Sequence, residues 1–176
     1  MDANTVTAIC ATGIAVASLA VSISQTRAVQ EHNRRSVRPF LQFEYQIVAS
    51  GQSGMRLRNV GLGPAIVTAT SVTLDGKHIG AWDEVTVNEL RRPLRRRPYA
   101  LTFHAGWALA AGYNELFMAL DDYERSRDEW FWELLRRRLV VEVRYESLYG
   151  GEQFSTRSDN PYDDQFLRER ANRLPS

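Results

Sequence analysis

The chain has 176 residues and a formal net charge of +1 at pH 7, with 22 basic and 21 acidic side chains. This near balance excludes the strongly basic composition that is typical of nucleic-acid-binding domains, so we expect no nucleic-acid partner. The single cysteine, Cys10, excludes a disulfide framework and a cysteine metal site. After the first 38 residues, enough chain remains for one domain of ordinary size.

The N-terminal segment is an uncharged run of 24 residues, from Ala3 to Thr26. As an α-helix it is about 36 Å long, enough to cross a hydrocarbon layer of about 30 Å. Basic residues follow the run and none precedes it, which predicts a retained anchor with the N-terminus outside and the C-terminal domain in the cytoplasm. The alternative is a cleavable signal peptide with a cleavage site at Ala15-Val16-Ala17. Four flanking arginines are expected to contact membrane lipid: Arg27, Arg34, Arg35 and Arg38.

Small side chains recur along this run at helical spacing. Faces of small residues let transmembrane helices approach closely, which predicts self-association of the helix. The alternative is that a weakly hydrophobic span is simply rich in alanine and serine. The residues predicted for the contact are Ala11, Gly13, Ala15, Ala17, Ser18 and Ser22.

Residues 39–158 have the short alternating segments of an antiparallel β domain. Apolar and polar side chains alternate from Leu41 to Ile47 and again from Leu139 to Glu146. Asp75-Gly76 is a preferred pair for a two-residue hairpin turn, and Gly150-Gly151 predicts a second such turn. Further strands are expected at residues 55–60, 66–74, 77–79, 99–103, 115–120 and 153–157.

Two helical insertions are expected in this domain. Residues 82–90 are typical of a short helix or irregular connection, and residues 122–138 of an amphipathic helix with early acids and late arginines. The expected fold class is mainly β, with one N-terminal transmembrane helix and an Ig-like antiparallel β-sandwich of about seven strands. The expected parts are a transmembrane helix with a juxtamembrane extension (1–38), the β-sandwich domain (39–158) and a polar C-terminal tail (159–176).

Five arginines in seven positions form the sharpest local feature of the domain. Their charges repel one another unless they meet an anion, such as a phosphate-bearing ligand, a nucleic acid or anionic lipid. Lipid is the favoured identity because the domain is tethered beside it. The alternative is a solvated loop that the acids between Asp83 and Glu89 partly neutralise. The predicted anion- or lipid-binding residues are Arg91, Arg92, Arg95, Arg96 and Arg97.

The sequence predicts no catalytic site, no metal site and no cofactor. Arg27 and His32 have the R-x4-H spacing of some ribonucleases, but that chemistry needs an all-helical bundle. His78 and His104 have no other metal-ligating residue at a suitable spacing. We therefore expect a protein that is not an enzyme.

Three segments of the chain resemble an uncharacterised group of bacterial single-pass membrane proteins. The segments are His32-Asn33-Arg34-Arg35-Ser36-Val37-Arg38-Pro39, Arg58-Asn59-Val60-Gly61-Leu62-Gly63-Pro64-Ala65 and Tyr145-Glu146-Ser147-Leu148-Tyr149-Gly150. The resemblance implies a short cytoplasmic β-rich domain after one helix, and a location in the bacterial inner membrane. It implies no activity, and the arginine loop is not part of it.

Taken together, these features favour a membrane-anchored cytoplasmic module for interaction or sensing. We expect it to recruit a protein partner and to form a homo-oligomer through its helix. The alternative is a ligand-gated membrane effector, whose layout is similar to that of the membrane-anchored β-domain effectors of anti-phage defence. In that case the arginine loop would bind a nucleotide or another phosphate-bearing messenger.

Overall fold

The computed structural model describes residues 2–48 and 51–159, and within the first helix it describes side chains for residues 11–27 and 29. The chain divides into a first unit that ends at Val37 and a second that begins at Arg38. The C-terminal tail expected at 159–176 lies outside the described residues, except for Asp159.

The first unit is a single α-helix, α1 (Ala3–Ser36), of 34 residues. Its described side chains from residue 11 to residue 27 are all exposed. Among the described residues, no helix combines the length and the hydropathy that a membrane span requires.

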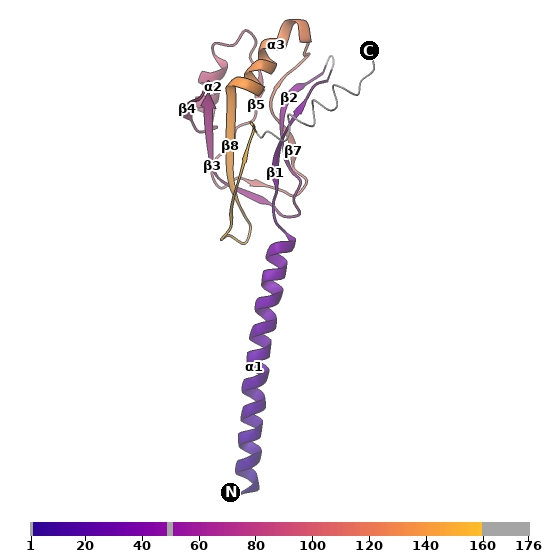
Figure 1. The fold of residues 1–176 in the computed structure, drawn as a ribbon, viewed down its shortest axis with the longest axis vertical. Coiled ribbons are helices and arrows are strands. Elements are labelled where there is room, and N and C mark those ends of the chain that lie inside the picture. The colour runs from indigo at the N-terminus through magenta and orange to yellow at the C-terminus, as the bar shows by residue number, and fades with distance from the viewer. Residues whose placement is uncertain (1, 49–50, 160–176) are drawn as a thin grey trace. The chain divides into compact units, whose positions relative to one another are not determined.

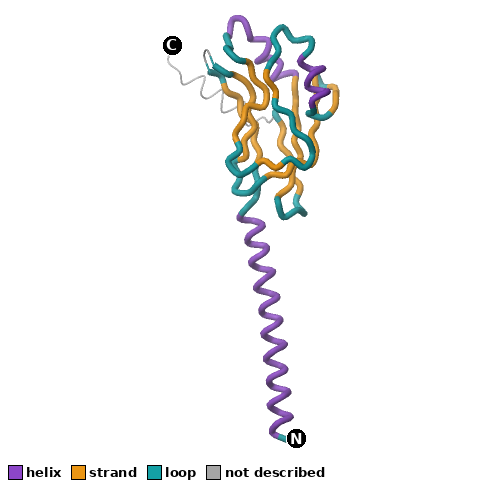
Figure 2. The backbone as a smooth tube through the Cα atoms, turned by 180° about the vertical axis from the view of Figure 1, so that it is seen from behind, coloured by secondary structure: helices purple, strands orange, loops and turns teal. Residues whose placement is uncertain are grey.

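The second unit contains two antiparallel sheets (Figures 1 and 2). The first has the order β1 (Leu41–Gln46), β2 (Ser53–Asn59), β7 (Asn114–Leu120) and β5 (Tyr99–Ala100). The second has the order β4 (Lys77–Gly80), β3 (Ala65–Leu74), β8 (Leu139–Ser147) and β9 (Gln153–Arg157), and β6 (Ala108–Leu109) also pairs with β3. The prediction of a mainly β domain with antiparallel sheets is confirmed.

Both sheets contribute to one hydrophobic core centred on Phe117 of β7. Its ring packs edge-on against Phe43 of β1, with centroids 5.3 Å apart, and stacks on Trp82 at 4.3 Å. Val67 and Val141 bring the second sheet into the same cluster. In β1 and β8 the buried side chains occupy alternate positions, which is why the period of two in the sequence located these two strands.

Two helical segments lie between strands, one between β4 and β5 and the other between β7 and β8. Helix α2 (Glu84–Arg91) agrees with the expected short helix, and the Asp83 side chain caps it by accepting from the Thr86 amide at 2.8 Å. The long helix expected at 122–138 is wrong in its extent. Helix α3 spans only Arg125–Glu133, with a non-helical residue at Asp128, and a π-helical segment, η1 (Leu134–Arg138), continues it. The other differences are the unexpected short strand β6 and the shortness of β5.

The core at Phe117 gives a first prediction. Replacing Phe117 by alanine should lower the free energy of unfolding by about 3–5 kcal/mol, because it removes a buried ring and leaves a cavity between the sheets. Denaturant unfolding of the purified chain measures the loss. Val85→Ala is a suitable control, because Val85 is 69 % exposed on α2 and should change stability by less than about 0.5 kcal/mol. An equal loss in both variants would contradict a core centred on Phe117.

Candidate functional site

The five arginines predicted to bind an anion lie at the end of α2 and in the connection to β5. We call Arg91–Arg97 the arginine segment. Arg92, Arg95 and Arg97 are exposed, whereas Arg91 and Arg96 are half-buried. The segment therefore divides into arginines that the fold uses and arginines that it presents to solvent.

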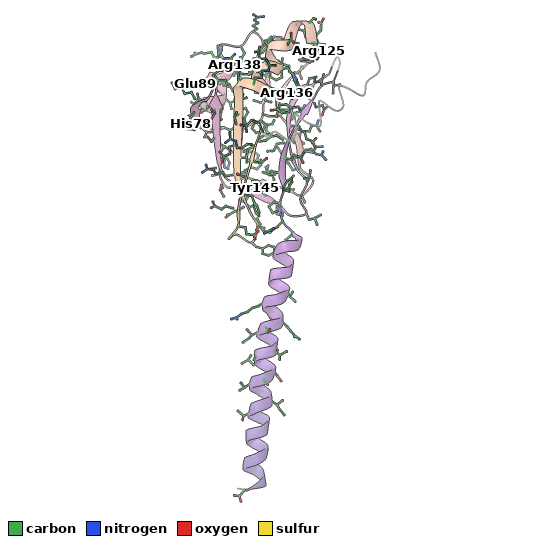
Figure 3. The ribbon with its side chains drawn as sticks, in the orientation of Figure 1. His78, Glu89, Arg125, Arg136, Arg138 and Tyr145 are labelled. Carbon is green, nitrogen blue, oxygen red and sulfur yellow. The ribbon has the colours of Figure 1, made fainter. Side chains whose placement is uncertain are left out.

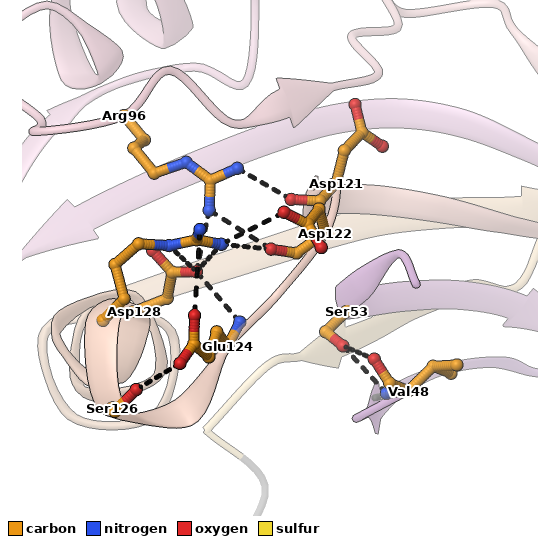
Figure 4. A network of polar contacts seen from close by, with 9 residues as sticks. Val48, Ser53, Arg96, Asp121, Asp122, Glu124, Ser126 and Asp128 are labelled. Atoms are coloured by element: carbon orange, nitrogen blue, oxygen red, sulfur yellow. Dashed lines mark hydrogen bonds and ion pairs between the residues drawn. The ribbon is translucent and has the colours of Figure 1, made fainter. Parts of the chain in front are cut away.

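Arg96 belongs to the fold. Its guanidinium Nη1 lies 2.7 Å from Oδ2 of Asp128, and its Nη2 donates to the carbonyl of Asp121 at 2.8 Å (Figure 4). The same Asp128 oxygen accepts from Arg127 at 3.0 Å and from the Glu124 amide at 3.0 Å. Asp128 is completely buried, so these donors replace part of the water that its charge would otherwise need, while its Oδ1 is buried without a hydrogen-bond partner. Arg96 thereby ties the arginine segment to the start of α3.

The charge of Asp128 is strongly favoured in the folded state. Burial alone would raise the pKa of its carboxyl, but the hydrogen bonds from Arg127, the Glu124 amide and Arg96 outweigh burial and lower the pKa to about 2. An early acid in this segment suggested a residue that complements a helix dipole. Instead Asp128 is the buried acceptor of a network that spans two segments of the chain.

Arg91 and Arg97 meet at one neutral atom. Nη2 of Arg91 donates to Oδ1 of Asn88 at 2.7 Å, and Nη2 of Arg97 donates to the same oxygen at 2.8 Å. Burial lowers the pKa of Arg91, the nearby charge of Arg97 lowers it further, and Glu84 opposes both effects. Among the described residues, no ion pair joins Arg91 or Arg97 to a carboxylate within 4 Å. The acids between Asp83 and Glu89, which were expected to neutralise the loop in part, therefore form no such ion pair with Arg91 or Arg97 within the described residues.

The arginine segment lies far from Arg38, where the chain enters the β domain. Asn59, at one end of β2, pairs with Leu41 of β1, which follows Arg38 closely in the sequence. Ser53, at the other end of β2, pairs with Leu120 of β7, and the next residue, Asp121, supplies the carbonyl that accepts from Arg96. Glu89 of α2 and Tyr145, whose hydroxyl accepts from the Leu41 amide at 3.1 Å, lie towards opposite ends of the domain (Figure 3). We call the end with Arg38 the proximal end and the end with the arginine segment the distal end.

The proximal end carries an apolar surface that sequence reasoning missed. Three loops meet there, because the Val60 amide donates to the Phe40 carbonyl at 2.8 Å and Arg38 pairs with Glu152 at 2.6 Å. Leu62, at 77 % exposure, lies in the middle loop. We call the exposed large apolar side chains of these loops the proximal surface: Phe40, Val60, Leu62, Leu148 and Tyr149. The glycines in these loops predicted turns. A turn prediction does not indicate whether neighbouring apolar side chains are exposed, so the sequence did not reveal this surface.

The sites predicted on α1 are exposed where their side chains are described. The Ser22 hydroxyl donates to the Ser18 carbonyl at 2.9 Å within the helix, and a Cβ atom built on Gly13 would meet nothing within 4 Å. No packing within the described chain therefore requires these small residues, and their role in self-association stays a prediction. The side chains of Arg34 and Arg35 lie outside the described residues.

Little in the described chain indicates chemistry. Ser71 and His78 hydrogen-bond at 3.2 Å on an exposed surface of β3 and β4, but a Ser–His contact needs an orienting acid and an oxyanion site to act as a nucleophile. Among the described residues, no group of three or more His, Cys, Asp or Glu side chains is placed to hold a metal ion.

The network around Asp128 gives a second prediction. Because its pKa is lowered in the folded state, Asp128 contributes stability at pH values above about 4, and this contribution is lost as the pH falls towards 2. Asp128→Asn should lower the free energy of unfolding at pH 7 by about 2–3 kcal/mol, because charge-assisted hydrogen bonds are lost. It should also flatten the dependence of stability on pH between 5 and 2.

Thermal unfolding as a function of pH measures both effects. Asp75→Asn is the matched control, because Asp75 forms an exposed ion pair with Arg138, and such pairs contribute little. If Asp128→Asn unfolds with the stability and pH profile of the Asp75 variant, the network does not stabilise the fold.

Comparison with protein-family models, with curated proteins and with solved structures finds no match to the chain.

Proposed function

We propose that this protein is a membrane-anchored interaction module, in which α1 crosses a bacterial inner membrane and the β domain recruits a protein partner. The observation that carries the proposal is the exposure of α1. Its side chains Ile14, Val16 and Leu19 are more than 60 % exposed, although burying each one would gain roughly 1.5–3 kcal/mol. A surrounding apolar phase would bury this uncovered apolar surface.

The sequence supports a bilayer as that phase. The uncharged run covers 24 residues of α1, about 36 Å of helix, which matches a hydrocarbon layer of about 30 Å with some tilt. Arginines follow the run and Asp2 precedes it, which favours a cytoplasmic β domain. For that domain we propose an Ig-like sandwich of its two sheets, and for α1 self-association through its small residues.

The proximal surface supports recruitment of a protein. Residues 27–36 continue α1 beyond the uncharged run by about 15 Å, whereas the headgroup layer is only about 5–8 Å thick on each side. The helix therefore extends past the headgroup layer before the β domain begins at Arg38. Exposed patches of large apolar side chains mark interaction sites, so a protein beside the membrane is the favoured partner.

The membrane anchor gives a third prediction. The full chain should sediment with membranes and resist extraction at alkaline pH. Val16→Arg combined with Leu19→Arg should move it to the soluble fraction, because each arginine at the centre of a span costs about 2.5–3.5 kcal/mol on insertion scales. Thr26→Arg, at the end of the run, should leave the chain in the membrane. A full chain that is soluble before any substitution would contradict the anchor.

Recruitment gives a fourth prediction. A photo-crosslinking residue at Leu62 should form a stoichiometric adduct with a second protein in native membranes, and one at Val85 on α2 should not. Leu62→Asp with Leu148→Asp should abolish co-purification of that protein without lowering the free energy of unfolding, because both side chains are exposed. Adducts only with lipid, or only with another copy of the chain, would contradict recruitment through this surface.

A further inference from the structure

We propose that the arginine segment is a binding site for a phosphate group of a ligand in solution, held by Arg91 and Arg97 with Arg92 and Arg95 beside them. The proposal does not depend on α1 crossing a membrane. The proposed site uses four of the five arginines that the sequence predicted to bind an anion, because Arg96 already forms an ion pair with Asp128.

The first argument is the convergence of charge at Asn88. Two guanidinium groups donate to the same amide oxygen, at 2.7 and 2.8 Å. Two like charges held this close repel each other, and a neutral oxygen offsets only part of that repulsion. The Nε atom of Arg91 is also buried without a hydrogen-bond partner. An anion beside the pair would supply the missing negative charge.

The second argument is the match between the donors and a phosphate. A guanidinium group presents its N–H donors in a planar fork, which binds two phosphate oxygens at once. Arg97 has only one hydrogen bond within the described chain, to Asn88, so it keeps most of its donors for a ligand. Arg92 and Arg95 add exposed positive charge on the same segment.

The third argument is that the segment is held in place before any ligand binds. Arg96, near the end of the segment, is fixed to Asp128. Nη1 of Arg91 donates at 3.1 Å to the carbonyl of Pro98, the residue that follows the segment, which holds the beginning of the segment close to its end. Leu94 packs against the hydrophobic core. A site that is already ordered binds its ligand with a smaller loss of conformational entropy.

A simpler explanation covers only part of this arrangement. Arg91 is the last residue of α2, where a positive charge complements the helix dipole. That explains one arginine. The helix dipole does not explain why Arg97, which lies outside the helix, also donates to the oxygen of Asn88 and so brings a second positive charge beside Arg91.

The position of the segment favours a ligand in solution over a lipid headgroup. Strand β3 runs ten residues from Ala65 to Leu74, about 33 Å, between the proximal and the distal end. Ala65 pairs with Ser147 beside the proximal loops, and Asp75 follows Leu74 at the other end. Within the β domain, the arginine segment is therefore separated by about the length of β3 from Arg38, where the chain enters the domain.

The test uses the full chain in nanodiscs of neutral phosphatidylcholine, with inorganic tripolyphosphate as the probe in isothermal titration calorimetry. We expect one binding site per chain, with an affinity that falls as salt is added. Arg97→Gln should weaken binding at least tenfold, and Arg95→Gln should weaken it less. Both side chains are exposed, so both variants should fold. Arg144→Gln is the matched control, because Arg144 is an exposed arginine already paired with Glu142 on β8.

Several results would overturn the proposal. One is the absence of binding by the unaltered chain at millimolar tripolyphosphate. Another is equal weakening by Arg97→Gln and Arg144→Gln, which would indicate diffuse attraction to a charged surface. In a parallel arm, nanodiscs of neutral lipid hold the chain while separate phosphatidylserine vesicles are added. Binding to these vesicles that needs Arg97, without binding of tripolyphosphate, would identify a lipid headgroup and contradict a ligand in solution.

Discussion

The packing around Phe117 is the contact on which the arrangement of the β domain depends. Its ring joins β1 through Phe43 and stacks on Trp82, and Trp82 lies directly before α2. The Trp82 amide donates to the Thr70 hydroxyl on β3 at 2.8 Å, and its indole N–H donates to the Leu101 carbonyl at 2.7 Å. One buried aromatic cluster therefore fixes the two sheets and the start of the helix that carries Asn88 and Arg91.

A buried electrostatic network adds to the packing of the core and fixes Arg96 of the arginine segment. Asp128 is buried and charged, and it holds Arg96 and Arg127 in one network. The same segment leaves Arg97 exposed on the neutral oxygen of Asn88. One arginine in the segment is neutralised by a carboxylate and its neighbour is not. This difference separates the structural role of Arg96 from the binding role that we propose for Arg97, although the two residues are adjacent in the sequence.

The sequence predicted those elements whose signal is local. Alternation located β1 and β8 because each has one buried face, and Asp75 with Gly76, both at positive φ, formed the hairpin turn expected of that pair. The short strand β6 has two residues, too few for a period to show. The helix expected at 122–138 is shorter because the backbone is not helical at Asp122 and again at Asp128. Asp128 contacts Arg96, which lies 32 residues earlier, and a local pattern could not show that contact. The same contact between Arg96 and Asp128 decides which arginine of the segment is neutralised by a carboxylate, and the sequence could not show it.

The loops of the proximal end show how a fold can leave its surface open to change. A Cβ atom on Gly61 would approach the Arg38 carbonyl and the Phe40 amide within 2.4 Å, so the loop is positioned by contact between backbones. Leu62, beside it, contributes little to that positioning, because its side chain is 77 % exposed. Substitutions at Leu62 are therefore nearly neutral for folding. Selection can alter the character of this surface over many generations, and with it the choice of the partner that we propose, while the architecture beneath stays the same.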